Sequence, residues 1–401
     1  MAVGKVPMEG PLRIIVTGLI AQYPLGGVTW DYFQYVLGLA RLGHEVYYFE
    51  DTGLWPYNPN EGGTATGCEF NVAYLSGLMS RFGLADRWAY CFSKETQWFG
   101  LSDAERTKVV ETTDLLINVS GVLRNPWDYR RIERMAYIDS DPVFTQVKLA
   151  RGQEDFRKLV DVHDVHFSFG EDFSAAVPQT GHRWLPTRQP IVLDEWQNTA
   201  ESRNAFTTVM NWTSYNPVEF AGRTYGQKDV EFRHFLDLPA AVAPTTLELA
   251  VNEGKTQRTP RSLLHHKGWS VVDPARVCFD LDSYRQYIQG SKAEWSVAKN
   301  GYVVGQSGWF SCRSACYLAA GRPVITQDTG FSRVLPTGEG LLAFRTFGEA
   351  VEAIRSVEAD YASHSRAARA IAEGYFDSGS VLRRLIDDSF LSTPGNNTEA
   401  R

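Results

Sequence analysis

The first fifty residues alternate between short apolar runs and a longer stretch in which apolar residues recur every three or four positions. Residues 12–18 and 44–51 are apolar runs, and residues 28–43 show helical spacing that stops at Gly43. A strand, a helix and a second strand in this order are typical of a parallel sheet with right-handed crossovers. The pattern therefore predicts an α/β domain at the start of the chain.

The same alternation continues to about residue 195 and starts again after a break. Strand-like runs predict a first α/β domain over 12–195, and residues 196–205 are polar without periodicity, as in a linker. A second α/β domain is predicted over 206–375, followed by a helix at 376–391 whose return to the first domain stays open. The predicted strands lie at 114–121, 134–142, 164–172, 206–212, 269–274, 301–307 and 322–328.

Two domains suit a chain of 401 residues. Parallel sheets bind ligands beyond the carboxyl ends of their strands, and a cleft between two such sheets is the usual place for a site. The predicted fold class is thus α/β, with two Rossmann-like domains that face a central cleft.

Composition and charge narrow the function classes. The formal net charge is −7 and no run is rich in Lys or Arg, so we expect no nucleic-acid partner. The five cysteines include no CxxC pair, which argues against a disulfide framework or a zinc knuckle. No signal peptide and no apolar run of roughly 18 residues is evident, so we expect a cytoplasmic protein without a transmembrane segment.

An arginine in an unfavourable position marks the first candidate site. Arg313 lies in the first turn of a predicted helix, where a cation costs roughly 0.3–1 kcal/mol unless a negative group is near. Glycines precede this helix, Ser311 can cap it, and Ser314 follows the arginine. Together they favour a phosphate or diphosphate site. The alternative is a salt bridge between Arg313 and a carboxylate of the protein.

Two glycine-containing loops add candidate ligand-binding residues. Gly26 and Gly27 precede the helix of the first domain, so the backbone near Gly27 can approach a ligand across the cleft. The segment "GRTYGQK" carries Arg223 and Lys228, two cations suited to a diphosphate leaving group. The alternatives are a plain turn and a solvated basic loop.

Two carboxylates follow a predicted strand of the first domain. Asp139 and Asp141 are candidates for binding sugar hydroxyls or for acting as a catalytic base, and helix capping or a turn is the alternative. We find no P-loop, nucleophile elbow or HExxH motif, and we predict no metal site. Several aromatic residues of the first domain suit core packing better than a sugar-stacking pocket: Trp30, Tyr32, Trp55 and Tyr57.

The segment "GWFSCRSACYLAAGRPVITQDTGFSRVLPTGEGLLAF" resembles the donor-binding half of GT-B glycosyltransferases, in particular the retaining nucleotide-sugar branch and a bacterial, uncharacterised subgroup. "GRTYGQK" is similar to the Arg/Lys pair of that branch, and "PLGGVTWDYFQYVLGLARLGHEVYYFED" to its first unit. The two glutamates of the branch's E-x7-E element fall on Gly308 and Cys316, so neither carboxylate is present. Glu339 or Glu294 is a candidate to replace the ribose contact.

The resemblance implies a glycosyltransferase of the hexosyltransferase type, without cofactor or metal, that uses a UDP-, GDP- or dTDP-sugar and an unknown acceptor. The first domain would bind the acceptor, with Asp139 and Asp141 as catalytic carboxylates, and the second domain the donor. The implied donor-binding residues are Gly27, Arg223, Lys228, Ser311, Arg313, Ser314 and Glu339. Two alternatives stay open: a nucleotide-sugar epimerase of the same fold, and an inactive nucleotide-sugar-binding partner subunit.

Overall fold

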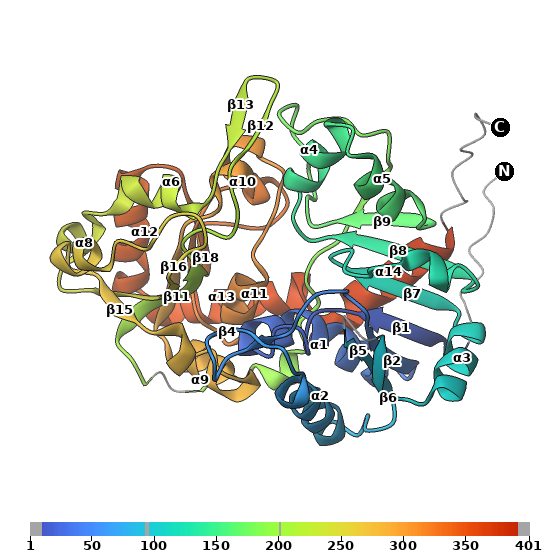
Figure 1. The fold of residues 1–401 in the computed structure, drawn as a ribbon. Helices are drawn as coiled ribbons and strands as arrows, with labels where there is room; N and C mark the ends of the chain where they lie inside the picture. Colours follow the sequence, from blue (N-terminus) through green and yellow to red (C-terminus); the bar gives the residue numbers. More distant parts are fainter. Residues whose placement is uncertain (1–9, 93–95, 200–201, 392–401) are drawn as a thin grey trace.

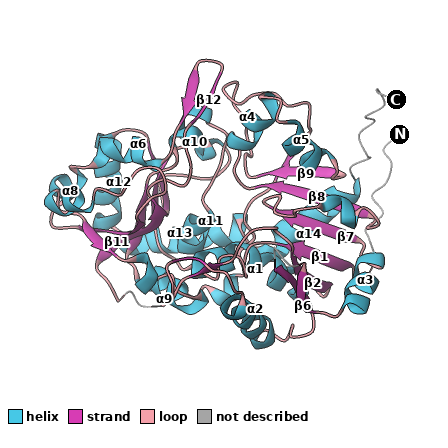
Figure 2. Ribbon diagram, viewed as in Figure 1, coloured by secondary structure: helices cyan, strands magenta, loops and turns pink. Residues whose placement is uncertain are grey.

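Two parallel sheets lie in separate halves of the molecule, and helices cover both (Figures 1 and 2). The computed structural model describes residues 10–92, 96–199 and 202–391. The first sheet has the order β10-β9-β8-β7-β1-β2-β5-β6, and all its neighbours are parallel except β5 and β6. Its strands are β1 (Arg13–Thr17), β2 (Glu45–Glu50), β5 (Trp88–Phe92), β6 (Gln97–Gly100), β7 (Leu115–Val119), β8 (Arg134–Asp139), β9 (Val165–Ser168) and β10 (Trp184–Pro186).

The second sheet is parallel throughout, with the order β15-β14-β11-β16-β17-β18. The predicted α/β class with two facing parallel sheets is therefore confirmed. Its strands are β11 (Ala205–Asn211), β14 (Thr246–Asn252), β15 (Ser270–Val272), β16 (Ala293–Ser296), β17 (Val324–Gln327) and β18 (Leu341–Phe344). Two short hairpins stand apart: β3 (Tyr57–Asn58) with β4 (Gly63–Thr64), and β12 (Val218–Phe220) with β13 (Arg223–Tyr225).

Helices connect the strands and fill the faces of both sheets (Figure 2). In the first half they are α1 (Gly26–Arg41), α2 (Glu69–Arg81), α3 (Asp103–Glu111), α4 (Phe144–Ala150) and α5 (Glu154–Asp161). Those that follow are α6 (Lys228–Phe232), α7 (Leu238–Val242), α8 (Arg261–His266), α9 (Leu281–Gly290), α10 (Asn300–Gly305), α11 (Cys312–Ala319), α12 (Phe347–Ala359), α13 (Tyr361–Tyr375) and α14 (Ser378–Leu391). Short 3-10 helices span Pro126–Tyr129, Leu193–Glu195, Arg233–Phe235, Pro274–Arg276 and Phe331–Arg333.

The strand predicted at 301–307 is wrong, because this segment forms α10. The preceding strand β16 already has β11 and β17 as its neighbours, so the sheet offers no place beside it for another strand. Instead, the Asn300 side chain accepts a hydrogen bond from the Gly226 amide (2.9 Å), and Gly301 packs on Phe144. A Cβ at Gly301 would lie 2.4 Å from that ring, so the close contact requires glycine.

The glycine pair in the first loop joins the two halves. Helix α1 begins at Gly26, two residues before the predicted start, and the Gly26 amide donates to the carbonyl of Cys278 (2.9 Å). A Cβ at Gly26 would lie 2.1 Å from the Asp280 carbonyl oxygen. Glycine is therefore required for the start of α1 to approach the segment that leads into α9.

The segment between the two sheets is anchored in the core of the first half. Trp196 is fully buried, its ring centroid lies 5.0 Å from that of Trp30, and its indole donates to the Gln34 side chain (3.0 Å). At the end of the chain, α14 packs against α1 and contacts β8. No helix in the described ranges is long and apolar enough to cross a bilayer.

Candidate functional site

A cavity of about 430 Å³ lies between the two sheets. Residues that end or follow β7, β8, β9, β11, β14, β15 and β16 line it, so it occupies the carboxyl side of both sheets, where parallel sheets bind ligands. The lining includes Gly27, Asp31 and Tyr32 of α1, Ser120 and Ser140 after β7 and β8, and Asn211, Lys228, Asn252, Lys299, Ser311 and Arg313 from the second half.

Arg313 lines this cavity and is also paired with a carboxylate. Its Nε lies 2.5 Å from Oε1 of Glu294, which is fully buried on β16, and its Nη1 donates to the Val209 carbonyl (2.8 Å). Burial lowers the pKa of Arg313, but the charge and hydrogen bond of Glu294, together with Tyr284 and Tyr317, outweigh burial, and the pKa is raised. The predicted alternative of a salt bridge between Arg313 and a carboxylate is therefore correct, but Arg313 also lines the cavity. Glu294 serves Arg313 and is not among the residues that line the cavity.

Lys228 is the unpaired cation of the cavity. It is half-buried at the first position of α6, and its ammonium group forms no hydrogen bond or salt bridge within the part of the chain that the structure describes. Burial lowers the pKa of Lys228 well below its ordinary value, and the charges of Arg313 and Lys299 lower it further. The cost of this arrangement indicates a site where an anion compensates the positive charge.

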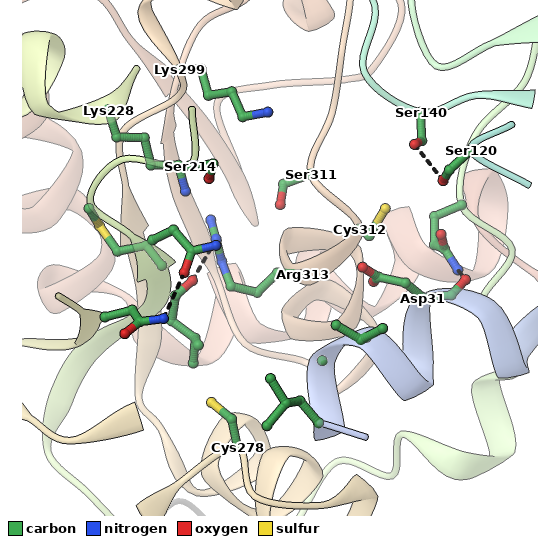
Figure 3. A pocket seen from close by; sticks show the side chains of 18 of the residues that line it. Asp31, Ser120, Ser140, Ser214, Lys228, Cys278, Lys299, Ser311, Cys312 and Arg313 are labelled. Atoms are coloured by element: carbon green, nitrogen blue, oxygen red, sulfur yellow. Dashed lines mark hydrogen bonds between the residues drawn. The ribbon is translucent and has the colours of Figure 1, made fainter. Parts of the chain in front are cut away.

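Lys299 is a third cation, which the sequence reasoning missed. Its Nζ lies 2.9 Å from Oδ1 of Asp141 and 2.9 Å from the Tyr215 hydroxyl. Figure 3 shows the side chains of Lys228, Lys299 and Arg313 on one side of the cavity, with Ser311 beside them. This side therefore carries three positive charges from segments far apart in the sequence.

Both predicted catalytic carboxylates lie outside the cavity lining. Asp139 is buried and accepts hydrogen bonds from Thr145, Gln146 and Ser168 (2.7–2.9 Å), and burial raises its pKa to about 6. It organises the loop between β8 and α4.

Asp141 connects the two halves of the molecule. Besides Lys299, it accepts from the hydroxyls of Tyr215 (2.7 Å) and Tyr302. Burial raises its pKa, but the Lys299 charge and the three hydrogen bonds outweigh burial and lower it. A carboxylate held in this way is a poor proton acceptor, so the structure does not support the interpretation of Asp141 as a base.

Three predicted donor-binding residues lie elsewhere. Arg223 is exposed on the β12–β13 hairpin, because the positive φ angles of Ala221 and Gly222 turn the chain tightly there. Glu339 is exposed and accepts a hydrogen bond from Ser363. Ser314 is buried, and it does not line the cavity.

Four predicted residues do line the cavity, although they lie up to 286 positions apart in the sequence: Gly27, Lys228, Ser311 and Arg313. Ser311 is the N-cap residue of α11, but its side chain makes no capping hydrogen bond. Its hydroxyl is therefore available to a ligand.

The aromatic residues of the first half divide between the core, the cavity and contacts with other aromatic rings. Trp30 is core, as predicted, whereas Tyr32 lines the cavity. Trp55 packs on Phe92, and Tyr57 lies beside Tyr23.

Among the described residues, no group of three or more His, Cys, Asp or Glu side chains is placed to hold a metal ion.

Asp31 is a further lining residue that the sequence reasoning missed. It lies four positions after Gly27 on α1, and this spacing places both on one face of the helix. Helical periodicity around the glycine pair was therefore the signal that could have found it.

The two facing parallel sheets, with a cavity at their carboxyl ends, have the arrangement of the GT-B fold. Solved structures with this fold cover nearly the whole chain. An α-glucosyltransferase in complex with UDP and a 13-mer DNA is 13% identical, with a TM-score of 0.59 over 94% of this chain and 100% of that one. HepE of Anabaena in complex with UDP and glucose is 13% identical, with a TM-score of 0.56 over 95% and 100%.

Sucrose-phosphate synthase from Thermosynechococcus elongatus is 15% identical, with a TM-score of 0.53 over 95% of this chain and 99% of that one. At these identities the likeness shows the fold. No family model matches the sequence, and no curated protein sequence matches it.

One expectation about partners is wrong. The net charge of −7 led us to expect no nucleic-acid partner. The α-glucosyltransferase that shares the fold is bound to DNA together with UDP. Net charge therefore does not exclude a nucleic-acid partner for a chain of this fold, because contacts with an acceptor depend on a local surface.

Proposed function

We propose that the chain is a glycosyltransferase of the hexosyltransferase type that transfers a sugar from a nucleoside-diphosphate sugar to an acceptor hydroxyl. The observation that carries this proposal is the convergence of Lys228, Lys299 and Arg313 on one side of the cavity, with Lys228 lacking a counter-ion among the described residues. A diphosphate is an anion of suitable charge for this group. UDP is the first nucleotide to test, since the similar solved structures include complexes with UDP.

The three cations also suit the chemistry of the leaving group. As the bond between the sugar and the diphosphate breaks, negative charge grows on the diphosphate oxygen. Fixed positive groups placed there in advance lower the barrier. The N-terminus of α11 adds backbone N–H groups, and the free Ser311 hydroxyl adds one more donor. In this proposal the side chains alone neutralise the diphosphate, so transfer needs no metal ion.

The nucleoside would bind without the E-x7-E carboxylates. Cys316, at the position of the second glutamate, is buried against Gln34, and Gly308 adopts a positive φ of 80°. Glu294 is engaged by Arg313. Asn211 and Asn252, at the ends of β11 and β14, line the cavity, and we propose their carboxamides as partners of the ribose hydroxyls.

A pair of variants from one segment tests the proposal. Lys228→Ala removes the unpaired cation, and Arg223→Ala removes a cation of the same "GRTYGQK" segment outside the cavity. UDP should raise the melting temperature of the native chain and of Arg223→Ala, but much less that of Lys228→Ala, because a ligand stabilises only the state that binds it. Equal shifts in all three proteins would refute the site.

Assays of turnover distinguish the transferase from the two alternatives, an epimerase and an inactive partner subunit. Product analysis with UDP-glucose, with and without candidate acceptors, should detect acceptor-dependent transfer. An epimerase would change the donor sugar without an acceptor. An inactive partner subunit would bind UDP and release no product under either condition.

A further inference from the structure

Asp31 is a carboxylate without a donor inside the cavity. It lies one turn after Gly27 on α1 and is half-buried. Its backbone carbonyl accepts from the Gln189 side chain (2.9 Å), but its carboxylate has no hydrogen bond or salt bridge within the described ranges. Partial burial of an unpaired carboxylate is unfavourable, and a ligand that donates hydrogen bonds would remove this cost.

A chain of hydroxyl groups lines the same side of the cavity. The Tyr32 hydroxyl donates to Ser120 Oγ (3.2 Å), and Ser120 Oγ lies 2.7 Å from Ser140 Oγ. The two serines directly follow β7 and β8 of the first sheet. Figure 3 shows Asp31, Ser120 and Ser140 on the side of the cavity opposite Lys228 and Lys299. Besides Asp31, this side offers neutral groups that both donate and accept.

The distribution of charge assigns different ligands to the two sides. A diphosphate is attracted to the three cations, whereas an anionic acceptor next to Asp31 would be repelled. A neutral molecule with several hydroxyls can donate to the carboxylate and exchange hydrogen bonds with the serines. We propose that Asp31 binds the reacting hydroxyl of a neutral carbohydrate acceptor and takes its proton during transfer. This inference rests on the proposed glycosyltransferase function.

The step balances with the groups present. The acceptor oxygen forms a new bond to the anomeric carbon of the donor sugar. The bond from that carbon to the diphosphate oxygen breaks, and its electron pair stays with the diphosphate. The acceptor proton passes to the Asp31 carboxylate and is later released to water. No oxidant or reductant is needed.

The surroundings of Asp31 suit a proton acceptor near neutral pH. Burial raises the pKa of Asp31 to about 7, and the positive charge of Arg313 opposes this rise. A base is most effective when its pKa lies near the working pH. The other titratable groups that face Asp31 stay neutral at this pH, because burial raises the pKa of each: Tyr32, Tyr35, Tyr284, Cys312 and Cys316.

The test uses the full chain with UDP-glucose and two acceptor series, neutral methyl glycosides and the corresponding sugar phosphates. The variants are Asp31→Asn and the conservative Asp31→Glu. We expect transfer to neutral glycosides, and a loss in kcat of about a hundredfold or more in Asp31→Asn. Asp31→Glu should keep part of the activity. The native kcat/KM should fall as the pH drops through about 7, and this fall should be absent from the residual activity of Asp31→Asn.

The shift in melting temperature caused by UDP distinguishes failure of the Asp31 proposal from failure of the proposed glycosyltransferase function. An unchanged shift in Asp31→Asn with lost transfer supports the proposal. A shift lost together with activity indicates a structural role and overturns it, as do unchanged transfer rates, preference for sugar phosphates, or no transfer to any neutral glycoside. If the native chain neither binds UDP nor consumes UDP-glucose, the glycosyltransferase function itself fails.

Discussion

Arg313 and Lys228 line the same cavity, yet they differ in whether the protein supplies a partner for their positive charge. The Arg313 guanidinium is held by the buried Glu294 and by the Val209 carbonyl, whereas Lys228 has no such partner in the described part of the chain. The first cation belongs to the folded framework as much as to the site. The second lowers stability in the free protein, so its place in the cavity is best explained by a ligand. The difference shows that a counter-ion within the protein, rather than the position in a helix, distinguishes a cation that also holds the fold together from one whose charge a ligand must compensate.

The largest effect should come from breaking the paired cation. Glu294→Gln leaves the charge of Arg313 without its buried partner, and removing one member of a buried pair costs about 3–5 kcal/mol. Urea unfolding monitored by circular dichroism measures the loss. The control is Glu339→Gln, an exposed glutamate whose replacement should change the free energy of unfolding by about 0.5 kcal/mol or less. A loss in Glu294→Gln as small as that of the control would contradict the pairing.

Removing the unpaired cation should have the opposite effect on stability. Lys228→Met eliminates a charge that burial and two neighbouring cations disfavour, so we expect the free energy of unfolding to rise at neutral pH. UDP affinity should fall by roughly ten- to a hundredfold, which corresponds to a charged hydrogen bond of about 1.5–3 kcal/mol. Urea unfolding and isothermal titration calorimetry measure the two effects. A variant that is less stable than the native chain would mean that Lys228 is paired after all.

The pH dependence of this gain follows from the sign of the pKa shift. The pKa of Lys228 is lower in the folded chain than its ordinary value of 10.5, so unfolding binds a proton at intermediate pH. The destabilisation by Lys228 is therefore complete below the folded pKa and disappears as the pH rises towards 10.5. The stability difference between Lys228→Met and the native chain should shrink in the same direction. A difference that stays constant with pH would rule out this origin.

Lys299 is an intermediate case, because its partner Asp141 belongs to the other half of the molecule. Asp141→Asn removes a carboxylate that competes with the diphosphate for this lysine. We expect several-fold tighter UDP binding, together with a loss of about 1–2 kcal/mol in unfolding free energy, since a charged hydrogen bond becomes neutral. Calorimetry and urea unfolding measure both. Weaker UDP binding would show that the Asp141 bridge holds Lys299 in its binding position.

Local patterns in the sequence predicted many of the strands and helices but not the roles of the charged residues. The alternation of runs over 12–51 identified β1, α1 and β2, because most apolar side chains of these elements are buried and their spacing follows the period of a strand or a helix. The sequence reasoning did not place α2, nor β5 and β6, which form the edge of the first sheet beside β2.

The pairing of the charged residues becomes apparent only in the folded structure. Arg313 and Glu294 are 19 positions apart, and Lys299 and Asp141 are 158 apart. Glu294 and Lys299 carry no local signal of their partners. The partner of Glu294 lies on helix α11, and the partner of Lys299 follows β8 in the other half of the molecule. The sequence therefore pointed to two of the three cavity cations, Lys228 and Arg313, and only the fold adds Lys299 and distinguishes the paired cations from the unpaired one.

The smallest predicted effect concerns Ser311, which separates capping from ligand binding. Replacing an N-cap serine with alanine usually costs about 1 kcal/mol of stability. Here the Ser311 side chain makes no capping hydrogen bond, so Ser311→Ala should change the free energy of unfolding by only about 0.5 kcal/mol or less. UDP binding should weaken by roughly two- to tenfold, as expected for one neutral hydrogen bond of about 0.5–1.5 kcal/mol. Thr346→Ala is the matched control, because the Thr346 hydroxyl accepts from the Glu349 amide (3.3 Å) at the start of α12. That variant should lose stability and keep UDP affinity; the reverse result for the pair would place Ser311 among the structural residues.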